Sequence, residues 1–375
     1  MKLLLDRSSF LSSLQLIARA TATRSAIQAL SGILITAEGD AAELAATDTE
    51  IGLRSPLEGT IEQPGRALVP GRLLLDIVRA LDASEVSLEY KVDKREMEVS
   101  AGQSRFVVKG LASEDFPHLP QPPGDTALKV PADVFASTVD RVARAASRDE
   151  TRPVLTGILV SVSQGKLRMV ATDSYRLSVR ETPADVGGAD DFEVNVPARA
   201  LQEASRIIAD TKPDQVAVLA AENQVVFGIG PVVLSSRMID GQFPNYQQLL
   251  PESYEQEIRL DRRELMGVVR RVSLMAQRNA PLRLKFEPGQ LTVAAQTPDV
   301  GEASEATPIG YTGEPLEIGF NPQFLQDGLE IAEADELVLK LISPLRPGLI
   351  EAGATDDEDQ AGSFLYLIMP VRLNV

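Results

Sequence analysis

The sequence has no cysteine, no tryptophan and a single histidine, His118, among its 375 residues. A chain without cysteine forms no disulfide and offers no thiolate as a nucleophile or metal ligand. One histidine leaves very little for a zinc or haem site, and a hydrolase with a histidine base would depend on His118 alone. We therefore expect no metal or cofactor in this protein.

Long apolar runs and an excess of positive charge are also missing. No stretch approaches the roughly 20 apolar residues that span a bilayer, and the N-terminal run MKLLLDRSSF is too short for a secretory signal. We expect a cytoplasmic protein that does not enter a membrane. The 37 Lys and Arg face 54 Asp and Glu, which gives a net charge of −17. Such a chain does not wrap nucleic acid over its whole surface, although it can still have a local basic face.

The chain is long enough for two or three domains, and it contains an internal repeat. Three segments each open with a helix-initiating residue and continue with apolar residues at helical spacing: 6–20, 131–146 and 261–276. Phe10, Phe135 and Leu265 take the same place in these segments, at separations of 125 and 130 residues. The pattern predicts three equivalent amphipathic helices.

A hairpin and a second helix are predicted after each of these segments. Glycine marks each hairpin turn and proline the start of each second helix, at Gly39, Gly165, Gly289 and at Pro70, Pro197, Pro322. Proline-containing stretches at 120–124 and 251–253 mark the junctions. We therefore predict an α+β protein of three tandem units, each with two helices packed on antiparallel sheets, over residues 1–122, 128–250 and 255–375.

Arginine gathers on the outer faces of the predicted helices, although the chain is acidic overall. The spacing of Arg141, Arg144 and Arg148 places them on one side of a helix, opposite its apolar residues. The last predicted helix is the exception, because its outer face carries Asp327 and Glu330. A shared arginine surface would bind the phosphates of a polyanion without reading bases; the alternative is that each exposed face simply carries charge. The candidate contacts for such a polyanion are Arg24, Arg72, Arg79, Arg141, Arg144, Arg148, Arg152, Arg199, Arg206 and Arg278.

The run Ala-Thr-Asp occurs at 46–48 and again 125 residues later, at 171–173. Asp48 and Asp173 could form the carboxylate site of an enzyme, with a divalent metal. However, they occupy equivalent places in separate units, so they would not meet in one cleft. The structural alternative is an Asp that fixes the turn after a strand. A scaffold protein without a nucleic-acid partner is a further alternative.

Several motifs, in this order, resemble one known family. They are the three tandem units, Ala-Thr-Asp-Ser-Tyr-Arg-Leu at 171–177, Phe-Pro-Asn-Tyr at 243–246 and Met-Pro-Val-Arg-Leu at 369–373. Together they resemble the bacterial sliding clamps, the β subunits of DNA polymerase III, over essentially the whole chain. The resemblance implies a non-catalytic processivity subunit, and a head-to-tail homodimer whose six domains form a ring around double-stranded DNA of any sequence.

The resemblance also implies a pocket for partner peptides between the second and third units. There the replicative polymerase α subunit, the clamp loader and other proteins with a clamp-binding motif would dock. An apolar groove with a few polar groups suits an extended peptide with apolar anchors. Arg176 and Arg372 would hold the carbonyls or acids of the peptide, whereas an ordinary place in the core is the alternative for Leu155, Leu177 and Leu367. The implied pocket residues are Leu155, Thr172, Ser174, Tyr175, Arg176, Leu177, Pro244, Leu249, Leu345, Pro347, Leu367, Met369, Pro370, Val371, Arg372 and Leu373.

The sequence departs from the family pattern at the rim of this pocket. Ser174 and Tyr175 stand where the family usually has Gly-His, and Gln248 stands where an Arg is common. Asn374 and Val375 extend past the usual terminal Leu. These changes would alter which partners the pocket prefers.

For the dimer seam, the resemblance implies that Phe106 packs against Leu274 of the other copy. Both are apolar residues in otherwise mixed stretches, so a role in the local core is the alternative. Association of opposite ends closes into a ring when the rotation allows it.

Overall fold

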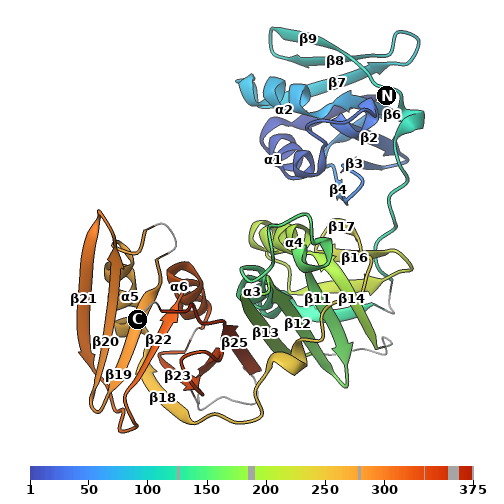
Figure 1. The fold of residues 1–375 in the computed structure, drawn as a ribbon. Helices are drawn as coiled ribbons and strands as arrows, with labels where there is room; N and C mark the ends of the chain where they lie inside the picture. Colours follow the sequence, from blue (N-terminus) through green and yellow to red (C-terminus); the bar gives the residue numbers. More distant parts are fainter. Residues whose placement is uncertain (125–126, 185–190, 278–279, 333, 354–362, 374–375) are drawn as a thin grey trace. The chain divides into compact units, whose positions relative to one another are not determined.

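The computed structural model describes residues 1–124, 127–184, 191–277, 280–332, 334–353 and 363–373. The chain separates into two compact units (Figure 1). The first is made chiefly of Met1–Phe135 and Glu203–Met238, and the second contains most of the remaining residues. The division therefore runs through the middle repeat.

The first repeat has two helices, α1 (Arg7–Ile17) and α2 (Gly71–Ala80), which contact each other. The side chain of Asp6 caps α1 by accepting a hydrogen bond from the backbone N–H of Ser9. The strands of this repeat are β1 (Lys2–Asp6), β2 (Gly32–Glu38), β3 (Ala41–Thr47), β4 (Ile51–Pro56), β5 (Thr60–Gln63), β6 (Gly65–Pro70), β7 (Glu85–Lys91), β8 (Glu96–Ala101) and β9 (Ser104–Lys109).

The second repeat follows the same order of elements, except that a single strand stands where the first repeat has β5 and β6. Its helices are α3 (Ala132–Ala143) and α4 (Ala198–Thr211). Its strands are β10 (Leu128–Pro131), β11 (Gly157–Ser163), β12 (Lys166–Thr172), β13 (Arg176–Pro183), β14 (Phe192–Pro197), β15 (Gln215–Ala220), β16 (Gln224–Ile229) and β17 (Val232–Arg237).

The third repeat has the helices α5 (Arg262–Ser273) and α6 (Pro322–Ile331), which also contact each other. Asp261 caps α5, and Asn321 caps α6. The strands are β18 (Gln256–Asp261), β19 (Leu282–Glu287), β20 (Gln290–Thr297), β21 (Gly301–Pro308), β22 (Leu316–Phe320), β23 (Glu336–Leu341), β24 (Gly348–Ala352) and β25 (Ser363–Ile368).

Two sheets run from one repeat into the next. In the first unit the order is β10-β15-β16-β17-β4-β3-β2-β6, where β17 of the second repeat pairs with β4 of the first. In the second unit the order is β14-β11-β12-β13-β25-β24-β23-β18, where β13 of the second repeat pairs with β25 of the third. Both pairings are antiparallel, so the backbone hydrogen bonds of the sheet bind neighbouring repeats together.

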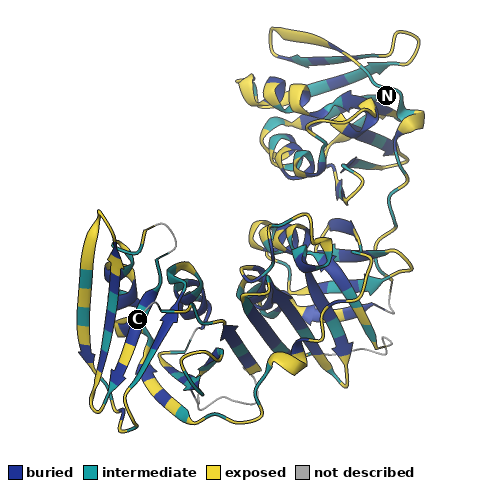
Figure 2. Cartoon of the chain, viewed as in Figure 1, coloured by how far each residue is buried: buried dark blue, intermediate teal, exposed yellow. Residues whose placement is uncertain are grey.

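The two remaining sheets end in exposed strands. They have the orders β5-β1-β7-β8-β9 and β21-β20-β19-β22. In β9 only Val108 is buried, and in β21 only Thr307 is buried. Figure 2 shows the contrast with β13 and β25, which are largely buried where the repeats meet. Among the described residues, β9 and β21 are thus sheet edges open to pairing.

The structure confirms the predicted α+β class and the equivalence of the first helices. Phe10, Phe135 and Leu265 are all buried in the core. The outer faces differ from expectation at two positions. Asp327 is only 7% exposed, because α6 faces the second repeat there. Arg141 is half-buried, and burial lowers the pKa of its guanidinium. No helix among the described residues is long and apolar enough to span a bilayer.

Candidate functional site

The turn between β12 and β13 holds the motif that the sequence singled out. The Thr172 hydroxyl donates to the carbonyl of Arg176 at 2.6 Å. One carboxylate oxygen of Asp173 accepts from the backbone N–H groups of Tyr175 at 2.9 Å and Arg176 at 3.0 Å. Ser174 has a φ of 79°. Asp173 therefore fixes a tight turn after a strand, as the structural alternative predicted.

The turn between β3 and β4 has the same construction. The Thr47 hydroxyl donates to the carbonyl of Ile51 at 2.7 Å, and Asp48 accepts from the backbone of Glu50 and Ile51. Thr49 repeats the φ of 79°. The two aspartates are structural counterparts, and among the described residues no group of three or more His, Cys, Asp or Glu could hold a metal.

Arg176 follows the turn between β12 and β13, and its side chain is 10% exposed. Its Nε donates to Asp173 at 3.1 Å, and its Nη2 donates to the carbonyl of Arg144. Its Nη1 donates to Asp327 and, at 3.4 Å, to the Tyr366 hydroxyl. Burial alone would lower the pKa of Arg176, but Tyr366, Asp327 and Asp173 together raise it. Arg176 therefore stays charged and joins the second repeat to α6 of the third.

Two stacked aromatic rings lie next to this arginine. The rings of Tyr175 and Phe324 are stacked with their centroids 6.4 Å apart and their planes at 28°. The guanidinium of Arg176 lies 4.4 Å from the centroid of Phe324, within the range of a cation–π contact. Tyr175 is 59% exposed, and its carbonyl accepts from the Met369 N–H at 2.8 Å. We call Tyr175, Phe324 and Met369 the aromatic face.

Phe324 was missed at the sequence level, because an aromatic residue in an amphipathic helix usually belongs to the core. Arg152 lies in a different place from the one predicted from the sequence. Its guanidinium donates to the Ser174 hydroxyl at 3.1 Å and to Asp149 at 2.9 Å. This arginine, expected on a DNA-facing helix surface, therefore lies on the same turn as the aromatic face.

The other predicted pocket residues are buried, half-buried or exposed. Leu177 and Leu367 are cross-strand partners in one apolar cluster with Phe243 and Tyr246. Leu155 and Thr172 are also buried, whereas Leu249, Leu345 and Met369 are exposed large apolar side chains. Ser174, Pro244 and Arg372 are exposed, and the half-buried members are Pro347, Pro370, Val371 and Leu373. The predicted set therefore contains both core residues and apolar side chains exposed to water.

The C-terminal segment after β25 lies against the third repeat. The Val371 N–H donates to the carbonyl of Gly319 at 2.8 Å. A Cβ on Gly319 would stand 2.7 Å from the Val371 oxygen and 2.6 Å from the Leu373 side chain, so this close approach requires glycine. Asn374 and Val375 lie outside the described residues.

The predicted DNA contacts are mostly exposed, and several have acidic partners. Arg79 pairs with Asp76, Arg206 with Glu203, and Arg144 with Glu330. Arg141 is half-buried, and Arg278 lies outside the described residues. Arg152 pairs with Asp149, and Arg24, Arg72, Arg148 and Arg199 are also exposed.

A second inter-repeat ion pair joins the first repeat to the second. Arg19, just after α1, pairs with Glu203 of α4 at 3.1 Å and with Asp210 at 2.9 Å. Glu203 is 4% exposed. Arg19 occupies the same place after α1 as Arg144 after α3, and Glu203 is the sixth residue of α4 as Asp327 is of α6. Arg144 lies 3.5 Å from Asp327, so the two joints have the same plan.

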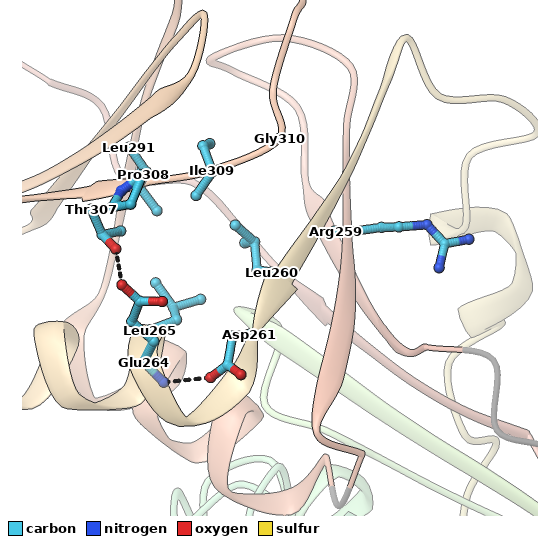
Figure 3. A pocket seen from close by; sticks show the side chains of 10 residues that line it. All are labelled: Arg259, Leu260, Asp261, Glu264, Leu265, Leu291, Thr307, Pro308, Ile309 and Gly310. Atoms are coloured by element: carbon cyan, nitrogen blue, oxygen red, sulfur yellow. Dashed lines mark hydrogen bonds between the residues drawn. The ribbon is translucent and has the colours of Figure 1, made fainter.

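A cavity of about 170 Å³ lies in the third repeat, between β18, the start of α5 and the end of β21 (Figure 3). The Thr307 hydroxyl donates to Glu264 across it, and the backbone N–H of Glu264 donates to Asp261 at 2.7 Å. None of the predicted pocket residues lines this cavity. Its polar groups serve the N-terminus of α5.

The repeats match three consecutive domains of one family. Residues 1–120, 129–245 and 247–372 match the N-terminal, central and C-terminal domains of the DNA polymerase III beta subunit. The beta sliding clamp of Streptomyces coelicolor is 35% identical over 100% of both chains. That of Bacillus subtilis is 31% identical over 99% of this chain and 100% of its own.

Solved structures agree over the full length. The crystal structure of the Bacillus subtilis DNA polymerase sliding clamp has a TM-score of 0.93 and 30% identity, with 100% of both chains covered. The sliding clamp of Pseudomonas aeruginosa bound to griselimycin has a TM-score of 0.90 and 29% identity over 100% of both chains. The fold therefore defines a clamp-type protein of three tandem repeats. The chain belongs to the family of bacterial DNA polymerase III beta subunits.

Proposed function

We propose that this chain is a DNA sliding clamp, a non-catalytic processivity subunit that tethers the replicative polymerase to duplex DNA. The observation that carries the proposal is the match of all three repeats, in order and over the whole chain, to the beta subunit domains. The domains extend over 1–122, 128–250 and 255–375. The protein acts in the cytoplasm, and it requires no cofactor.

Two copies of the chain associate head to tail and close into a ring. The exposed edges support this proposal, because β17–β4 and β13–β25 already join the repeats inside one chain. Among the strands at sheet edges, β9 lies in the first repeat and β21 in the third, and both are largely exposed. Their pairing between copies would continue both sheets by the same antiparallel rule. Phe106, 39% exposed on β9, then belongs to the seam.

The position of Leu274 within its repeat supports the same seam. It occupies the place of Arg19 and Arg144, just after the first helix of its repeat, and it is 72% exposed. Asp76, the sixth residue of α2, occupies the place of Glu203 and Asp327. Leu73 on the same helix is 48% exposed. At the seam a leucine thus stands in the place of the arginine found at the two joints inside the chain. Association buries apolar area that is exposed to water in a single copy.

Duplex DNA passes through the ring and meets exposed arginines. Arg24, Arg72, Arg79, Arg148, Arg199 and Arg206 are the proposed contacts, with Arg144 held by Glu330 until phosphate competes for it. Arginines bound to phosphates recognise no base sequence. Arg141 is withdrawn from this set, because its guanidinium is half-buried.

Partner proteins dock a peptide between the second and third repeats. The support is the aromatic face, the exposed side chains of Leu249 and Leu345, and the buried apolar cluster that contains Leu177 and Leu367. Apolar groups of this kind take up the anchors of an extended peptide. The partners are the polymerase α subunit, the clamp loader and other proteins with a clamp-binding motif.

Loading onto circular DNA tests the ring. Clamps loaded on a nicked circular plasmid should stay bound during gel filtration and should be released when a restriction enzyme linearises the plasmid. The same plasmid linearised before loading is the control. Equal retention on linear DNA, or a monomer at about micromolar concentration in sedimentation, would contradict the proposal.

Removal of residues Met369 to Val375 tests the docking site. The truncated protein should lose binding to the polymerase α subunit in surface plasmon resonance and should remain a dimer, because β9 and β21 are untouched. A matched point variant is Met369→Ala, which removes one exposed apolar group and should weaken binding by about tenfold. Unchanged polymerase binding by the truncated dimer would overturn the assignment of the site.

A further inference from the structure

Arg176 was expected to hold the carbonyls or acids of a partner peptide, but its donors are already engaged. All three guanidinium nitrogens donate to acceptors of the chain itself: Asp173, Asp327, the Tyr366 hydroxyl and the carbonyl of Arg144. Of its five N–H groups, four are therefore accounted for. A peptide that needed more than the one remaining N–H of Arg176 would have to break contacts that hold a nearly buried charge, and this is costly.

The main acceptor, Asp327, is fixed as firmly as the arginine. One of its oxygens binds Arg176, and the other accepts from Gln323 at 2.9 Å. The Tyr366 hydroxyl, beside Arg176, donates to the carbonyl of Phe324 at 2.9 Å. The backbone of α6 at Phe324 is thereby tied to the same cluster. Arg176 thus contacts the ring of Phe324 directly and is linked to its backbone through Tyr366.

The other joint shows that this arginine is not needed to connect two repeats. Arg19 and Glu203 join the first repeat to the second, as Arg144 and Asp327 join the second to the third. At the place of Arg176, however, the first repeat has Ile51, in a turn closed by the same threonine hydrogen bond. The added arginine occurs only where the aromatic face lies.

We propose that Arg176 is a positioning residue of the docking site: anchored by Asp327 across the repeat boundary, it holds Phe324 against Tyr175 and does not touch the peptide. This inference rests on the proposed function and assigns the residue a different role within it. It makes the shape of the docking site depend on how the second and third repeats are joined. A strained or opened joint would release Phe324 and lower affinity for every partner alike.

Peptide binding to four variants separates positioning from direct contact. The probe is a fluorescent clamp-binding-motif peptide, prepared in an acidic and a neutral version. Arg176→Lys and Asp327→Asn should each weaken both peptides by about tenfold, and the double variant should be little worse than either single one, because lysine lacks the fork that bridges the cluster. Glu203→Gln, which disturbs the other joint, should leave both affinities unchanged.

A direct contact predicts the reverse. Arg176→Lys would then weaken the acidic peptide alone, and Asp327→Asn, by freeing the guanidinium, would leave affinity unchanged or increase it. Either result overturns the inference. If the unaltered protein binds neither peptide, the proposed docking function fails instead, and a second measurement still tests the positioning.

That measurement uses the absence of tryptophan from the sequence. A Tyr175→Trp variant carries one indole stacked on Phe324, and its emission reports the state of the face without any ligand. Adding Arg176→Lys or Asp327→Asn should shift the emission to the red and lower its anisotropy, whereas adding Glu203→Gln should not. An unchanged emission in a protein that keeps its melting temperature would contradict a positioning role.

Discussion

Arg19 meets Glu203 where the first repeat meets the second, and Arg144 meets Asp327 where the second meets the third. The two joints share the positions of their ions and an antiparallel strand pair. They differ in how far their arginine side chains are buried. The Arg19 side chain is 34% exposed, whereas the added Arg176 is 10% exposed and has an acceptor on each nitrogen. The same joint can therefore serve as a simple connection or as the support of a binding surface.

The largest expected difference between the joints concerns their buried carboxylates. Asp327→Asn leaves Arg176 without its main counter-ion in a nearly closed site, and we expect a loss of roughly 3 kcal/mol in the local stability of that joint. Glu203→Gln should cost about 1 kcal/mol, because water reaches Arg19 and Arg206. Hydrogen exchange of Arg176–Pro183 and Pro322–Ile331, against Ala198–Thr211, measures the two losses. Equal losses would mean that Arg176 does not make the second joint depend more strongly on its buried carboxylate.

The helical pattern predicted the repeats but not the joints. Phe10, Phe135 and Leu265 could be found because burial within a repeat follows the 3.6-residue period. Asp327 was assigned to an outer face because the pattern of one helix shows which side its own sheet covers. The residue pattern of a helix gives no signal for a side that the next repeat covers. Phe324 was missed for the same reason, since its partners Tyr175 and Arg176 come from another repeat.

The turn of the aromatic face was partly predictable. Asp173 was correctly interpreted as a structural residue, because Asp48 repeats it in a separate repeat. The Arg152–Ser174 contact depends on how the chain enters β11, which residue spacing does not fix. The predicted arginine stripe failed at Arg141, because the spacing of residues on one helix does not show what other elements bury. Burial lowers the pKa of Arg141. Burial and the charge of Arg141 lower the pKa of Arg180 to about 10.

The proposed seam extends the comparison to a third joint, between copies. Leu274→Asp should raise the dimer dissociation constant by about a hundredfold, because it removes an apolar contact and places a carboxylate near Asp76 of the other copy. Leu274→Arg should have a much smaller effect, since it restores the pairing used by Arg19 and Arg144. Sedimentation velocity over a concentration series measures both.

The control is Asp76→Ala added to each variant. It should make Leu274→Arg as disruptive as Leu274→Asp, and it should partly relieve the latter. If arginine and aspartate at 274 weaken the dimer equally, the seam is not built on the plan of the internal joints.

A smaller effect is expected from the two matched turns. Ser174 and Thr49 both have a φ of 79°, a region that costs a residue with a Cβ about 1 kcal/mol relative to glycine. Thr49→Gly should therefore stabilise its hairpin by up to about 1 kcal/mol. Ser174→Gly should gain less, because it also loses the hydrogen bond from Arg152. Differential scanning calorimetry of the two variants checks the order; a larger gain at 174 would contradict the role of Arg152.

The smallest expected effect is a pH dependence at the second joint. Hydrogen bonds from Arg270 and Arg144 hold the pKa of Glu330 below its usual range, with burial acting in the opposite direction. A carboxyl whose folded pKa is lowered stabilises the fold above its unfolded pKa of about 4.3 and loses that contribution as the pH falls through the folded pKa. The difference in melting temperature between the unaltered protein and Glu330→Gln should thus be present at about pH 6 and should shrink as the pH falls below about 4.3. Added salt should shrink it too, since Arg144 and Arg270 are 46% and 59% exposed. The same scan on an Arg144→Gln background isolates the bond between the repeats, and a difference that persists at low pH would show that Glu330 acts through packing.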